Sequence, residues 1–191
     1  MRTLPGIILG TLGCWLGASQ ATAQLTNYYT ATPATKLEAF ETNIAVVILK
    51  ASTEVGSIAA ETGDVLVKCR EITDTGTGHV EQGLGMDIIP RAQARSALLV
   101  DYDEIPALVT AIDYISRLEV TATPLNAFDA AYTTKGGFRV AALGNRRTGV
   151  IQFGVRDART GATPVVFSRD DMTRLAALIN QAKATLDSVR R

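Results

Sequence analysis

The side chains that most often perform catalysis are sparse in this sequence. His79 is the single histidine, and it lies in residues 75–79, a Thr- and Gly-rich run that is typical of a solvated turn. A lone histidine cannot activate a nucleophile without a partner. Zinc sites need several Cys or His ligands, whereas this chain adds only Cys14 and Cys69 to its histidine. The sequence therefore predicts a non-enzymatic protein with no catalytic residues, no bound metal and no cofactor.

An acidic cluster, Asp101, Asp103 and Glu104, is the one group of residues that suggests a cation site. Carboxylates coordinate hard cations such as Ca²⁺ when a shaped loop makes several oxygens converge. These residues instead lead directly into a predicted helix, and negative charge is favourable at a helix N-terminus. We favour this second interpretation over the metal site.

Charge is distributed unequally along the chain. Residues 24–124 hold 7 Lys and Arg against 14 Asp and Glu, a net charge of −7, whereas residues 125–191 hold 11 against 5, a net charge of +6. Guanidinium groups bind carboxylates and phosphates through forked donors. We therefore expect an anion-binding patch formed by Arg139, Arg146, Arg147, Arg156 and Arg159. The alternative to an exposed patch is that the basic half faces the acidic half, either within one molecule or between two molecules. Charge complementarity would then set the register and the choice of partner.

Two similar series of elements must position these residues. The first has Val- and Ile-rich strands, punctuated by Gly, Asn and Asp, at residues 43–50, 54–60, 64–73, 80–89 and 96–100. A helix follows, capped by Asp103, with one apolar face formed by Ile105, Leu108, Ile112 and Ile115. Residues 119–124 form a linker. The second series has strands at 127–134, 138–143, 150–156 and 164–167, and then a helix. Ser168 and Asp171 form its N-terminal capping pair.

The two series align with each other at both ends. Residues 37–42 match 125–130, and residues 99–105 match 166–172, so the first copy carries about 21 extra residues between its ends. One such unit cannot bury both its sheet and its helix, whereas two copies can share a core. We therefore predict an α+β fold with two tandem copies, 37–118 and 125–191. Each is an antiparallel multi-strand unit that ends in a helix, and the two pack as one pseudo-symmetric body.

This order of elements resembles the Whirly and Pur-alpha type of fold, in which four-strand-plus-helix units are paired. The resemblance covers most of residues 37–187 and implies a fold that elsewhere grips single-stranded nucleic acid. The sequence segments at residues 101–105 and 111–115 are also similar to segments of small exported bacterial proteins of unassigned function. That second resemblance implies no activity.

The N-terminus has the pattern of an export signal. Arg2 precedes an apolar run at residues 4–18, and residues 21–23 (Ala-Thr-Ala) suit cleavage before Gln24. The apolar run falls short of the ~18–20 residues that span a bilayer, and no later segment is long enough. We therefore predict a signal peptide over 1–23, a flexible lead-in over 24–36 and a periplasmic or secreted protein. Lipid attachment at Cys14 is the alternative.

These features favour an exported binding or protein-interaction module that recognises a protein partner or self-associates through its oppositely charged halves. The alternative is binding of a polyanion or single-stranded nucleic acid through the Arg-rich second copy. Nucleic acid is the less favoured partner, because the chain after Gln24 has a net charge of −1 and nucleic acid is scarce outside the cytoplasm. The remaining cysteine, Cys69, alternates with Val65 and Val67, which predicts a buried, inert thiol.

Overall fold

The computed structural model describes residues 32–190, and the predicted signal peptide and Cys14 lie outside this range. The first unit contains α1 (Lys36–Glu41), β1 (Ile48–Ala60), β2 (Gly63–Asp74), β3 (Val80–Pro90), β4 (Ser96–Asp101), the 3-10 turn η1 (Tyr102–Glu104) and α2 (Ile105–Ser116). The second contains β5 (Ala127–Thr133), β6 (Phe138–Asn145), β7 (Val150–Asp157), β8 (Val165–Phe167) and α3 (Arg169–Val189). The strands form two antiparallel sheets, ordered β1-β2-β3-β4 and β5-β6-β7-β8. The predicted fold class is confirmed.

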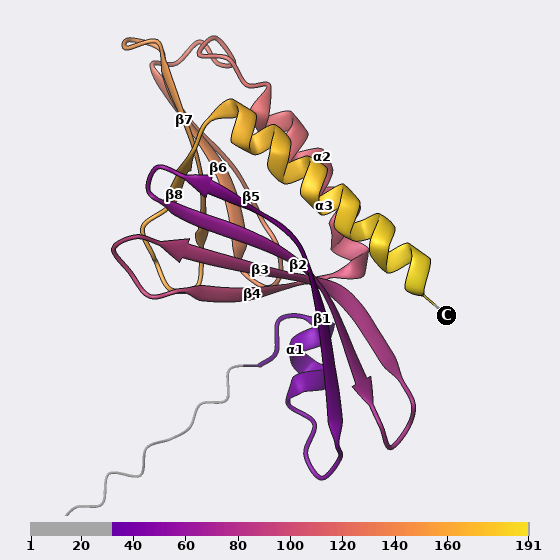
Figure 1. Ribbon diagram of the computed structural model, residues 1–191. Coiled ribbons are helices and arrows are strands. Elements are labelled where there is room, and N and C mark those ends of the chain that lie inside the picture. The colour runs from indigo at the N-terminus through magenta and orange to yellow at the C-terminus, as the bar shows by residue number, and fades with distance from the viewer. Residues whose placement is uncertain (1–31, 191) are drawn as a thin grey trace, which may run out of the picture. The chain divides into compact units, whose positions relative to one another are not determined.

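Each long helix packs on the sheet of the other unit. Helix α3 lies against β1, β2 and β3, whereas α2 lies against β5 and β6, and the two helices contact each other (Figure 1). The apolar faces predicted from the helical period are buried in this shared core, including Ile112 on α2 and Ile179 on α3. The predicted capping box of Ser168 and Asp171 begins α3. Because each helix covers the partner sheet, the core requires both units.

The strands of the first unit are longer than their counterparts in the second. Strands β1, β2 and β3 have 13, 12 and 11 residues, against 7, 8 and 8 in β5, β6 and β7. The extra residues expected in the first copy therefore lengthen its sheet. Residues 48–50 of the first predicted strand and all of the second, 54–60, form one strand, β1, with a register shift between Glu54 and Gly56. Residues 43–47, predicted as the start of the first strand, precede β1 and are not in a strand. A Cβ atom at Gly56 would lie 2.8 Å from Leu178 of α3, so the absence of a side chain at this position lets the helix approach the sheet closely.

Helix α1 is the element that the periodicity did not predict. Thr35 and Glu38 form a capping box at its start, and Leu37 is fully buried. The helix packs near β2, β3 and β4. The predicted flexible lead-in over 24–36 consequently differs from the structure at its last two residues, because Thr35 is buried and Lys36 begins α1.

The prediction that Asp103 caps the helix at 105–116 is wrong. Glu104, rather than Asp103, occupies the N-cap position of α2, and its side chain makes no capping bond there. The intervening 3-10 turn moves Asp103 away from the helix end. Among the helices of residues 32–190, none is long and apolar enough to cross a bilayer.

Candidate ligand-binding groove

A groove of about 900 Å³ lies where the long strands of the first sheet extend past α3. The ends of β2 and β3 that are joined by residues 75–79 project away from the helix (Figure 1). Side chains on the α3-facing side of the strands line the groove, among them Thr53, Cys69, Glu71, Thr73, Val80 and Gln82. Tyr102 and the last turns of α3, with Leu186, Val189 and Arg190, line its other side. The unequal lengths of the two units thus leave part of a sheet face uncovered.

The floor of the groove holds a carboxylate. Glu71 on β2 lies directly opposite Gln82 on β3, and Gln82 Nε2 donates a hydrogen bond to Glu71 Oε2 at 2.7 Å. No lysine or arginine of residues 32–190 forms an ion pair with Glu71, and the buried Gln82 Oε1 has no hydrogen-bond partner among the same residues. The floor therefore offers a half-buried carboxylate that can accept a further hydrogen bond.

Cationic side chains surround Tyr102 at the rim of the groove. Lys183 Nζ and the Arg190 guanidinium lie 5.1 and 4.3 Å from the centre of the Tyr102 ring. The Tyr102 hydroxyl donates to Asp187, and Lys183 Nζ lies 2.8 Å from the same carboxylate. The hydrogen bond from Lys183 holds the pKa of Asp187 below its usual range. The same hydrogen bond raises the pKa of Lys183. The rim therefore holds an ion pair of Lys183 and Asp187 beside the Tyr102 ring.

Cys69 and His79 border the groove without a catalytic arrangement between them. The Cys69 thiol is buried, as predicted, and donates to the carbonyl of Ala182 at 3.4 Å, while burial raises its pKa. The His79 ring contacts the Phe40 ring in a tilted arrangement with the two centroids 5.0 Å apart, and His79 Nε2 lies 3.3 Å from Glu81. A raised thiol pKa disfavours the nucleophilic thiolate.

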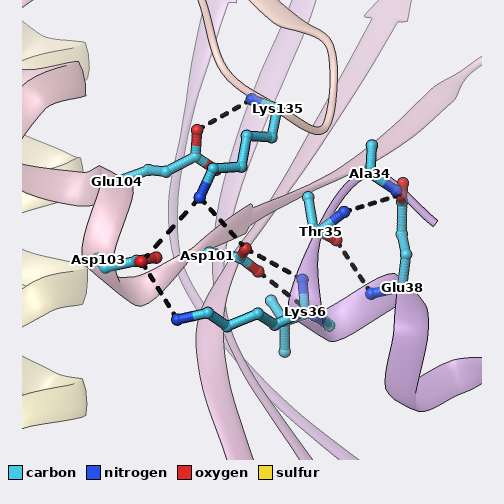
Figure 2. A network of polar contacts seen from close by, with 9 residues as sticks. Ala34, Thr35, Lys36, Glu38, Asp101, Asp103, Glu104 and Lys135 are labelled. Atoms are coloured by element: carbon cyan, nitrogen blue, oxygen red, sulfur yellow. Dashed lines mark hydrogen bonds and ion pairs between the residues drawn. The ribbon is translucent and has the colours of Figure 1, made fainter.

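The acidic cluster at residues 101–104 binds groups of the protein itself (Figure 2). Asp101 is buried and accepts hydrogen bonds from the backbone N–H groups of Lys36 at 3.0 Å and Leu37 at 3.3 Å, so it holds the first turn of α1. Asp103 pairs with Lys36 Nζ at 3.1 Å, and this hydrogen bond lowers the pKa of Asp103. Glu104 accepts from the Lys135 backbone N–H at 2.9 Å, which joins the two units. Within residues 32–190, no three His, Cys, Asp or Glu side chains are placed to hold a metal ion.

The five arginines expected to form one patch lie at two ends of the second sheet. Arg139 and Arg156 are directly opposite each other on β6 and β7. Arg146 and Arg147 follow the far end of β6, an eight-residue strand, ~25 Å away at about 3.4 Å per residue. Arg146 donates to the Pro124 carbonyl at 3.1 Å. The structure therefore divides the expected patch.

Some basic side chains of the second unit pair with acids of the first. Arg159 Nη1 lies 2.6 Å from Glu38, and Lys135 Nζ lies 4.0 Å from Asp103. Arg169 Nη2 lies 3.6 Å from Glu119 in the linker between the units. Arg139 has an acid from its own sheet, Asp129 at 3.4 Å. Sequence reasoning missed the groove itself. Its signal was the extra length of the first copy, which indicates a sheet longer than its covering helix.

No family model matches this chain, and no curated protein matches it. Among solved structures, WHY1 from Arabidopsis thaliana is 12% identical with a TM-score of 0.33, over 74% of this chain and 98% of that chain. The plant transcriptional regulator PBF-2 is 12% identical with a TM-score of 0.30, over 75% of this chain and 88% of that chain. Likeness at this level carries no argument about the site or the function of this protein.

Proposed function

We propose that this protein is a non-enzymatic binding module that holds a cationic, peptide-like ligand in the groove beside α3. The observation that carries the proposal is Glu71, a carboxylate in the groove that bonds to the neutral Gln82 amide at 2.7 Å. An ammonium group of a ligand, such as a peptide N-terminus or a lysine side chain, would give Glu71 a charge-assisted hydrogen bond. Arg190 at the rim suits a ligand carboxylate.

The size and lining of the groove support the same class of ligand. Binding sites for small molecules are typically clefts of about 300–1,000 Å³ with a few placed polar groups among apolar ones. The groove falls in this range, and Val80, Leu186 and Val189 supply apolar surface beside the hydroxyls of Thr53 and Thr73. A short peptide can fill such a groove with its backbone and side chains.

The test is a thermal-shift screen against tripeptides with free termini, followed by calorimetric titration of those that stabilise the protein. Glu71→Gln removes the charge and keeps an acceptor for Gln82, so we expect affinity to fall by about tenfold or more, as for loss of a charged hydrogen bond. Glu61→Gln, in the exposed turn between β1 and β2, is the matched control and should bind like the wild type. Binding that is equal in both variants, or no stabilisation by any tripeptide, would contradict the proposal.

A second candidate function, polyanion binding, is favoured by Arg139 and Arg156. Like charges directly opposite on neighbouring strands destabilise a sheet. Asp129, 3.4 Å from Arg139, offsets part of this repulsion, and an anion bound at Arg156 would offset the rest. Binding of labelled single-stranded DNA or heparin should then weaken steeply with salt and be lost in Arg156→Ala. The same change at Arg147, at the other end of the sheet, is the control. Salt-insensitive or absent binding at low salt would exclude this candidate.

We also propose that the protein is exported. The support is the predicted signal peptide over residues 1–23, with its Ala-Thr-Ala cleavage pattern. N-terminal sequencing of protein recovered from the periplasm or the culture medium should begin at Gln24. A lipid-modified Cys14 at the N-terminus would instead establish a lipoprotein, and an intact Met1 in the cytoplasm would exclude export.

A further inference from the structure

The outer edge of β1 is unpaired in the part of the chain that the structure describes. β1 is the first strand in the order β1-β2-β3-β4 and is 13 residues long. All side chains from Leu49 to Glu54 are exposed, and Leu49 itself is 58% exposed. A long edge strand of this kind is a template for pairing with another strand unless it is covered.

The backbone of β1 presents its polar groups to this edge at alternate residues. The Val47 carbonyl accepts a hydrogen bond from the Thr75 N–H at 3.1 Å, and the register continues with Leu49 opposite Thr73. In an antiparallel ladder, residues that bond to the neighbouring strand alternate with residues that point away. Lys50, Ser52 and Glu54 therefore direct their N–H and C=O groups outward.

We propose that a second copy of this chain pairs antiparallel with β1 about a two-fold axis at Ser52. In this register Lys50 lies opposite Glu54 of the second copy, and Glu54 lies opposite its Lys50. The edge carries one charge of each sign, spaced equally about Ser52, so two ion pairs form at once. Lys50 Nζ also lies 3.2 Å from Glu41 of its own molecule, and in the dimer it is shared between Glu41 and Glu54 of the second copy. Leu49 meets Val55 of the second copy, which covers part of the exposed apolar surface. This self-complementarity is what an isologous dimer interface requires.

The dimer would also bring the grooves of the two copies next to each other. The local two-fold axis of an antiparallel pair is perpendicular to the sheet, so both grooves open on the same face. Ala51 and Thr53 belong to the groove and lie next to the axis. The two grooves therefore become neighbours across β1. This inference goes beyond the proposed function, because the pairing of edges does not depend on any ligand.

Sedimentation velocity at protein concentrations from about 1 to 100 μM tests the dimer. The wild type should be dimeric in the upper part of this range. Glu54→Lys places lysine opposite lysine twice, so we expect the dimer to weaken by about tenfold or more. The double variant Lys50→Glu with Glu54→Lys exchanges the two charges and should restore the dimer. Glu61→Lys, a charge reversal in the β1–β2 turn, should leave it unchanged.

Ser52→Pro tests the backbone pairing separately from the charges. The N–H group that proline removes points outward, and proline is tolerated on edge strands, so the protein should keep its circular dichroism spectrum and be monomeric. A wild type that remains monomeric at 100 μM would overturn the proposal. So would a dimer that persists in both Ser52→Pro and Glu54→Lys.

Discussion

At the scale of single residues, Asp101 connects the N-terminal helix to the first sheet. It is 2% exposed and accepts hydrogen bonds from the backbone N–H groups of Lys36 and Leu37. Asp101→Ala leaves these groups without a partner, and we expect it to lower the free energy of unfolding by about 2–3 kcal/mol. Urea denaturation measures this loss. Asp103→Ala, which breaks the exposed ion pair with Lys36, should cost less than about 1 kcal/mol. Equal losses would contradict the role of Asp101.

A pH dependence follows from Asp103 and Asp187, whose pKa values are lowered by hydrogen bonds from Lys36 and Lys183. A carboxyl with a lowered folded-state pKa stabilises the fold above its unfolded value, about 3.9, and this stabilisation is lost as the pH falls through the folded value. The urea midpoint should therefore drop between pH 5 and pH 2. In the double variant Asp103→Asn with Asp187→Asn the drop should be smaller, and an unchanged drop would contradict this assignment.

The sequence predicted the acidic cluster but not what it binds. Asp101, Asp103 and Glu104 were expected to serve the helix that follows them, since negative charge suits a helix N-terminus. In the structure Asp101 serves α1, which begins 65 residues earlier. Spacing along the chain contains no information on such a distant contact. Burial of Cys69 was predictable because it follows from alternation within one strand.

At the scale of elements, the turn between β5 and β6 joins the second unit to β4 through Gly136. A Cβ atom at this buried position would overlap the carbonyl group of Leu99. Gly136→Ala should therefore cost about 1–3 kcal/mol of folding free energy, which thermal or urea unfolding would measure. Gly76→Ala, in the exposed turn after β2, is the control and should have a smaller effect. If both variants unfold like the wild type, the close contact at Leu99 is not formed.

Elements with strong periodicity were predictable, and those defined by a few residues were not. The apolar faces of α2 and α3 recur over three turns or more, so the helical period identified both. α1 has six residues, too few for a period, and its capping box of Thr35 and Glu38 was its only signal. Strand β1 was divided in two at residues 51–53, because Ala51, Ser52 and Thr53 are small, exposed residues without the Val and Ile content that marks a strand.

At the scale of the whole described unit, the exchange of helices makes the two halves mutually dependent. Met172, Leu175 and Ile179 of α3 are buried in the core that the two units share, and the helix contacts β1, β2, β3 and α2 of the first unit. A fragment of residues 125–191 would expose this face, so we expect it to show no cooperative thermal transition as a monomer. Adding the fragment of residues 24–124 should restore a cooperative transition. A cooperative melt of either fragment alone would show that the units fold independently.

The fold class could be predicted from two similar series of elements, whereas the candidate site could not. The groove arises because the strands of the first unit are longer than α3 can cover, and this depends on how one unit's helix crosses the other unit's sheet. The five arginines predicted to form one patch lie apart because their positions also depend on the fold. Arg146 and Arg139 are close in sequence, but an extended strand separates them.

Chemical-shift mapping by NMR is the most direct test of the proposed binding groove. The ¹⁵N-labelled protein would be titrated with the tripeptide that stabilises it most in the thermal-shift screen. If the ligand binds in the groove, the shifts should be confined to residues 51–53, 69–73 and 79–82, with Tyr102 and the C-terminal turn of α3. Shifts centred on Arg139 and Arg156 of the second sheet, with the groove unperturbed, would contradict binding in the groove.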